Sequence, residues 1–208
     1  MKKFKLPLLL LFVFLFSEAF SYDNIKKDKK TIINSIESQK DRLIEISDNI
    51  WEAAEPALLE FKSSKYLSDY AEENGFRVTR GVAEIPTAFV AEFGSGKPVI
   101  GILGEFDANP GISQKKQPTK EPLVKGAAGH GCGHNLYGTG SLGAAIAIKE
   151  MIESGEISGT VRFYGTPAEE TIFAKVWMVR SGLFDDVDVC MDWHPSDEVE
   201  AATQSSKA

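Results

Sequence analysis

The sequence predicts an α/β fold, a three-layer sandwich in which helices cover both faces of a largely parallel β-sheet. Segments with the pattern of short strands alternate along the chain with segments of helical periodicity, the order that produces parallel sheets. One strand, Val99–Leu103, is apolar throughout, as strands buried on both faces are. With 208 residues, 43% of them hydrophobic, the chain has room for one sizeable core.

The elements can be assigned in order along the chain. Apolar residues at helical spacing from Ile32 to Trp51 predict an amphipathic helix that ends near Glu55 and Pro56. A second helix is expected at Phe61–Asn74, with a glycine directly after it as its stop. The remaining expected elements are strands at Arg77–Val82, Thr87–Phe93, Val99–Leu103, Thr160–Gly165 and Val187–Trp193, and helices at Asn135–Glu153 and Phe173–Ser181.

The first 21 residues have the layout of an export signal. Three lysines precede an apolar run from Leu6 to Phe16, and small residues surround a cleavage point after Ser21. The run is shorter than the roughly 20 residues that a membrane-spanning helix needs. We therefore predict a signal peptide at residues 1–21, a domain at residues 22–208, and a periplasmic or secreted protein that has no membrane anchor after cleavage.

Charge and cysteine content exclude several functions. Removing the leader, which carries three lysines and one glutamate, changes the formal net charge from −7 to −9. Such an acidic domain is unsuited to nucleic acid or to an anionic membrane surface. Two cysteines, Cys132 and Cys190, are too few for a disulfide scaffold, although one disulfide between them stays an alternative.

A glycine-rich motif contains two of the three histidines. Gly129–Asn135 places Cys132 and His134 two residues apart, at the end of a long irregular segment. Residues two apart in extended backbone point the same way, so thiolate and imidazole can bind one ion. These ligands suit zinc, and imidazole with carboxylate also accepts manganese. The alternative is a glycine-rich turn that buries a thiol; His130, beside Cys132, is assigned no role.

Two adjacent glutamates follow the expected strand Thr160–Gly165. Glu169 and Glu170 project in different directions, so one can bind a metal while the other takes a proton from a metal-bound water. An acidic helix N-terminus would have the same composition.

The third histidine, His194, directly follows the last expected strand, and Asp107 follows the strand Val99–Leu103. Ligands of parallel sheets bind at the carboxyl ends of the strands, so these residues, the glutamates and the cysteine motif should share one edge. Asp107 is a candidate for orienting a ligating histidine, the alternative being an aspartate that faces water. Together the segments predict a metal site.

A match to a nucleotide-binding motif is rejected. Gly138–Gly143 has the spacing G-x-G-x-x-G, but it lies inside an expected helix and does not connect a strand to a helix. Close packing of that helix on the sheet accounts better for these glycines.

Four motifs resemble, in order, those of the aminoacylase/carboxypeptidase-type metallo-amidohydrolases, and most closely the p-aminobenzoyl-glutamate hydrolase branch of that metallopeptidase family. The motifs are Gly104–Gly111, Gly129–Asn135, Gly165–Glu170 and Trp193–Asp197. The resemblance covers most of the chain after the leader. It implies a co-catalytic metallopeptidase-like catalytic domain that cleaves N-acyl amino acids, p-aminobenzoyl-glutamate-like conjugates or dipeptides.

The resemblance also implies a role for each site residue. Two divalent ions, Zn²⁺ or Mn²⁺, are implied in the complete enzyme. The implied metal ligands are Cys132, His134, Glu170 and His194. Glu169 is the implied general base, and we place Asp107 with it among the catalytic residues.

The chain departs from the family pattern at two points. Thr171–Phe173 follow the glutamate pair where the family has small residues, often glycines. Family members are also longer, with an inserted lid domain for dimerisation and substrate binding and a later histidine ligand. We therefore expect residues 22–208 to be the N-terminal part of the catalytic domain. Alone, the chain should bind metal weakly, hydrolyse small amides poorly and not form the family's homodimer.

Two other classes of protein stay open. An inactive metal-binding remnant of such an enzyme would keep the ligands without turnover. A redox or structural α/β protein would instead join Cys132 to Cys190, and thiol titration of the unfolded chain separates this class because a disulfide leaves no free thiol.

We predict that Met1–Ser21 is absent from the mature protein, because its charge and length match a signal sequence. Mass spectrometry of protein purified from the native host should find Tyr22 as the first residue. Recovery of an intact Met1 would contradict the prediction.

Overall fold

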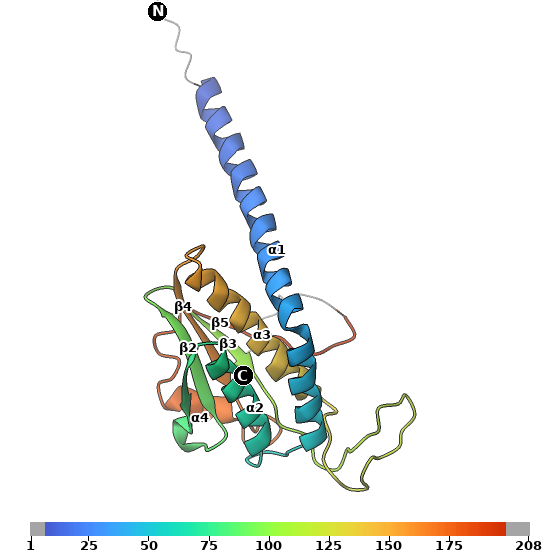
Figure 1. Ribbon diagram of the computed structural model, residues 1–208. Helices are drawn as coiled ribbons and strands as arrows, with labels where there is room; N and C mark the ends of the chain where they lie inside the picture. The colour runs from blue at the N-terminus through green and yellow to red at the C-terminus, as the bar shows by residue number, and fades with distance from the viewer. Residues whose placement is uncertain (1–6, 199–208) are drawn as a thin grey trace, which may run out of the picture.

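The computed structural model describes residues 7–198, with side chains from residue 25 onward, and has the predicted α/β fold (Figure 1). Its five-stranded sheet has the order β1-β2-β4-β3-β5. The strands are β1 (Arg77–Arg80), β2 (Phe89–Ser95), β3 (Val99–Gly104), β4 (Gly159–Gly165) and β5 (Val189–Met191). Strands β4, β3 and β5 are parallel, whereas β2 pairs antiparallel with both β4 and β1. The parallel strands therefore end at one edge, where a site is expected.

Helices cover both faces of the sheet. Three helices lie over one face, α1 (Pro7–Ala53), α2 (Phe61–Glu73) and α3 (His134–Glu153). The short helices η1 (Val82–Glu84) and α4 (Ala174–Arg180) pack on the other. Successive residues of β4 serve the two cores: Phe163 is buried beneath α2 and α3, and Tyr164 is buried beside α4. The three layers of the predicted sandwich are thus present.

The predicted boundaries lie within two residues of those observed, except at the start of α1. The periodicity predicted a helix from Ile32, but the helix begins at Pro7 and projects well beyond the sheet (Figure 1). The Lys- and Asp-rich segment between them contains no proline or glycine, so nothing interrupts the helical backbone. Residues 1–6 of the predicted leader lie outside the described residues, and the leader's side chains are not described. Within residues 7–198, no helix combines the length and apolarity needed to cross a membrane.

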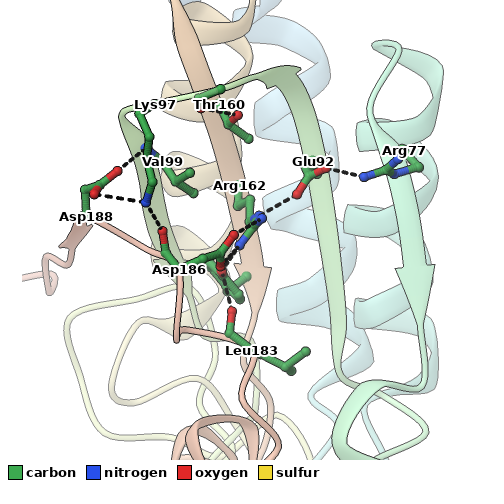
Figure 2. Close-up of polar contacts among 11 residues, drawn as sticks. Arg77, Glu92, Lys97, Val99, Thr160, Arg162, Leu183, Asp186 and Asp188 are labelled. Carbon is green, nitrogen blue, oxygen red and sulfur yellow. Dashed lines mark hydrogen bonds and ion pairs between the residues drawn. The ribbon is translucent and has the colours of Figure 1, made fainter.

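Polar contacts tie the segment before β5 to the sheet (Figure 2). Arg162 of β4 donates to both carboxylate oxygens of Asp186, at 2.6 and 2.8 Å. Asp188 accepts the backbone N–H of Val99 in β3 at 2.7 Å. Because β5 follows directly, these contacts fix where it begins and where the residues after it lie.

Two glycines of the rejected motif are packing residues in α3. A Cβ atom on Gly138 would lie 2.6 Å from the backbone carbonyl oxygen of Glu105. A Cβ atom on Gly143 would meet only the tip of the Leu43 side chain, at 2.9 Å. Helix α3 therefore packs closely on the end of β3 at Gly138, which confirms the packing interpretation for that glycine, whereas Gly143 faces α1.

We predict that Gly138→Ala lowers the free energy of unfolding by about 1–3 kcal/mol, because a fixed backbone oxygen cannot move away from the new methyl group. Gly143→Ala is the matched control: Leu43 can rotate, and alanine favours the helix by up to about 1 kcal/mol. Urea unfolding of both variants measures the difference. Equal losses in the two variants would show that α3 does not depend on this contact.

Candidate metal centre

Cys132, His134 and His194 lie together at the carboxyl edge of the sheet. Their ligand atoms are all within 4.8 Å of one another. Cys132 Sγ lies 3.2 Å from His194 Nε2, although 62 residues separate them. Gly133 turns the chain between the first two residues with a left-handed φ of 83°. The structure thus brings three of the four predicted ligands into one cluster.

Hydrogen bonds behind each imidazole leave its Nε2 facing that cluster. His134 Nδ1 donates to Asp107 Oδ1 at 2.9 Å. His194 Nδ1 donates to the carbonyl oxygen of Pro195, also at 2.9 Å. When Nδ1 carries the proton of a neutral ring, Nε2 offers its lone pair to a metal. Asp107 lies where it can orient a ligating histidine.

The glutamate pair approaches His134 from the end of β4. Glu170 Oε1 lies 3.9 Å from His134 Nε2, and the Glu170 N–H donates to Asp107 Oδ2 at 3.0 Å. Glu169 and Glu105 each offer a carboxylate oxygen within 4.8 Å of a His134 ring nitrogen. Among the described residues, Glu170 does not join the tight cluster of thiol and imidazoles. It borders that cluster at His134 and at Cys132.

Two buried atoms at this centre have no hydrogen-bond partner among the described residues: His134 Nε2 and Glu170 Oε1. Glu105 Oε2 lies 2.9 Å from that ring nitrogen, but not in hydrogen-bonding geometry. Because buried polar atoms are almost always paired, unpaired ones indicate that the site binds a further group. Imidazole, thiol and carboxylate are donors that zinc accepts, so the residues present fit a divalent metal ion.

Burial and neighbouring carboxylates govern protonation at the centre. Burial raises the pKa of Glu169, and the charge of Glu105 raises it further. Burial alone would lower the pKa of His134, but the hydrogen bond to Asp107 and the adjacent carboxylate of Glu105 raise it to about 10. Burial, with a hydrogen bond to Glu170, raises the pKa of the Cys132 thiol to about 11. A glutamate with a raised pKa is suited to accept a proton.

Sequence reasoning missed two residues of the site, Glu105 and Lys175. Glu105 is 5% exposed, faces His134 and pairs with Lys175 of α4. It lies two residues before Asp107, and residues two apart in extended backbone share a direction, so that spacing could have identified it. Lys175 carried no such signal, because it reaches the site only through the fold of α4.

His130 does not contribute to the cluster. Its Nε2 donates to the carbonyl oxygen of Ile50 in α1 at 3.1 Å, and burial lowers its pKa to about 4. The disulfide considered from the sequence is not formed, because Cys132 and Cys190 are both free.

This α/β fold carries thiol, imidazole and carboxylate donors at the strand ends of its mixed β-sheet. That is the arrangement of a metal-dependent hydrolase. The chain belongs to the peptidase family M20/M25/M40, whose family model matches residues 101–205. The resemblance based on the four motifs is therefore confirmed.

Curated relatives match the chain over part of their length. The chain is 50% identical over 167 residues to one of the subunits of the p-aminobenzoyl-glutamate hydrolase of Escherichia coli, covering 79% of this chain and 34% of that protein. It is 30% identical over 182 residues to the Xaa-Arg dipeptidase of Mus musculus, covering 82% and 38%. The chain thus spans little more than a third of the length of these relatives.

A solved structure shares the fold. The crystal structure of a dinuclear metal-binding peptidase of the M20 family from Bacillus subtilis matches with a TM-score of 0.63 and 27% identity. The match covers 74% of this chain and 42% of that one.

We predict that Cys132 binds a divalent ion as its thiolate. Saturating Co²⁺ should give the chain a thiolate-to-cobalt charge-transfer absorption, which Cys132→Ser should abolish. Cys190→Ser is the matched control, because Cys190 lies in β5 outside the cluster. Loss of the absorption in Cys190→Ser, or its survival in Cys132→Ser, would contradict the assignment.

Proposed function

We propose that this chain supplies the metal-binding part of a metal-dependent amidohydrolase. Its substrates would be N-acyl amino acids, p-aminobenzoyl-glutamate-like conjugates or dipeptides. The observation that carries the proposal is a carboxylate pair at the end of β4 facing an imidazole whose inner nitrogen is buried and makes no hydrogen bond. The names of the relatives, a p-aminobenzoyl-glutamate hydrolase and a dipeptidase, support a small amide substrate.

The proposed metal ligands are Cys132, His134, Glu170 and His194, holding zinc or manganese. The description of the Bacillus subtilis structure as dinuclear supports two ions in the complete enzyme. When bound, the metal would polarise the amide carbonyl and make water acidic enough to attack it.

The chain's own residues would then move the proton and hold the site in place. Glu169 would take the proton of the attacking water and return it to the leaving amine, for which its raised pKa is suited. Asp107 would hold His134 and Glu170 in fixed relative positions, because each of its carboxylate oxygens accepts a hydrogen bond from one of them. Lys175 would hold Glu105 by an ion pair.

The remaining proposals concern the protein's localisation, binding partner and oligomeric state. We propose export through the leader at residues 1–21. The partner would be a small amide rather than nucleic acid, because the chain is acidic. Dimerisation, as the family resemblance implies, would be a property of the complete enzyme.

We predict that Glu169→Gln reduces hydrolysis by about 10²–10⁴-fold, because a positioned general base contributes about that much. The assay is metal-dependent cleavage of p-aminobenzoyl-glutamate and N-acyl amino acids by the purified chain with zinc or manganese. We expect the unmodified chain to be slower than a full-length relative.

Glu150→Gln is the matched control, because Glu150 is an exposed glutamate of α3. It should leave the rate unchanged. Hydrolysis that is insensitive to Glu169→Gln would contradict the mechanism. Metal binding without any turnover that depends on Glu169 would support the inactive remnant instead.

A further inference from the structure

We propose that Glu60 is a positioning residue that holds the turn carrying Glu169. The inference rests on the proposed function, in which Glu169 is the base. Glu60 stands at the start of α2, 108 residues before Ala168 in that turn, and is 0% exposed. A fully buried carboxyl group costs free energy unless its oxygens accept hydrogen bonds, so its partners indicate its purpose.

Helix capping does not explain why a buried glutamate stands at position 60. It occupies the N-cap position of α2, but its side chain makes no capping hydrogen bond. Glu55 caps the helix instead, because its carboxylate accepts the backbone N–H groups of Lys62 and Ser63 at 2.9–3.1 Å. The Glu60 side chain is therefore free to point into the core.

Both oxygens of Glu60 accept hydrogen bonds from uncharged groups. Oε1 accepts the backbone N–H of Ala168 at 2.9 Å, and Oε2 accepts the hydroxyl of Thr87 at 3.0 Å. Thr87 lies two residues before β2 and Ala168 three residues after β4, and these strands are neighbours in the sheet. Glu60 thus links α2 to the ends of two strands.

The turn needs such an anchor because its backbone is strained. Ala168 has φ of 57°, a left-handed conformation that alanine rarely adopts unless the surroundings impose it. On the other side of Glu169, the Glu170 N–H is held by Asp107 at 3.0 Å. Glu169 is therefore flanked by two N–H groups, each held by a carboxylate from another segment. Without Glu60, the Ala168 N–H would be buried and unpaired, and the direction of Glu169 would be less fixed.

The test compares Glu60→Met with the unmodified chain. Methionine fills a similar volume but cannot accept the Ala168 N–H. Amide hydrogen exchange in a peptide covering residues 165–172 should become at least about 10-fold faster, because the turn opens locally. Turnover should fall by about 10–100-fold with KM nearly unchanged, because the base is misplaced while substrate contacts remain.

Two control variants separate positioning from general destabilisation. Thr87→Val removes the other hydrogen bond of Glu60 and keeps the Ala168 contact, so exchange and turnover should stay within about 3-fold of the unmodified chain. Glu60→Gln keeps an acceptor for Ala168, and its amide can donate to the Thr87 hydroxyl, so it should behave like the unmodified chain. If Glu60→Met does not fold, Glu60→Asp replaces it, because its shorter side chain cannot span both partners.

Three results would overturn the proposal. One is unchanged exchange in the turn when the acceptor is lost. Another is an effect of Thr87→Val as large as that of Glu60→Met. The third is a loss of turnover in Glu60→Gln while the turn stays protected, which would mean that the charge and not the hydrogen bond matters. If the unmodified chain hydrolyses no amide, the proposed function fails, and hydrogen exchange still decides whether Glu60 holds the turn.

Discussion

The hydrogen bond between His134 and Asp107 is the interaction on which the centre depends. Both side chains are almost fully buried, at 0% and 1% exposure, so neither can satisfy its polar atoms with water. Asp107 also accepts the N–H of Glu170, and therefore joins the segment after β3 to the start of α3 and to the turn after β4. A buried carboxylate is tolerated only while its partners stay in place. The three segments consequently hold a fixed arrangement before any ligand binds.

Helix α3 extends this constraint to the second imidazole. Tyr137 and Ser141 lie one and two turns after His134, on the same face of the helix. The Tyr137 hydroxyl donates to Asp192, and Trp193 Nε1 donates to Ser141 Oγ at 2.9 Å. The residues that precede His194 are thus bound to the helix that begins with His134. The polar contacts of the residues just before β5 fix the N-terminal end of the same segment (Figure 2). The two imidazoles meet because one helix positions both.

Sequence reasoning succeeded where the information was local. Glycine stops, apolar runs and strand–helix alternation predicted the sheet, and the shared position at strand ends predicted that Cys132, His134 and His194 would meet. It missed Glu60 and Lys175, because their contacts join residues 108 and 70 positions apart and leave no pattern in either segment. It also began α1 too late, since a charged segment without apolar periodicity can still be helical. Apolar periodicity marks the buried face of a helix, so a helical stretch that is exposed on all sides shows no such periodicity.

The electrostatics of the centre explain why a cation is the group that fits. Four carboxylates, two after β3 and two after β4, surround His134, and the ion pair with Lys175 compensates one of them. Like charges at this distance disfavour ionisation, which contributes to the raised pKa of Glu169. The raised pKa of His134 has the same origin, since a proton on that ring offsets the negative field. A bound divalent ion would replace that proton and reverse the local field, freeing Nε2 as a ligand and favouring the ionised form of Glu169. The groups that attract the ion are thus the groups whose protonation the ion would set to the state that the proposed mechanism requires.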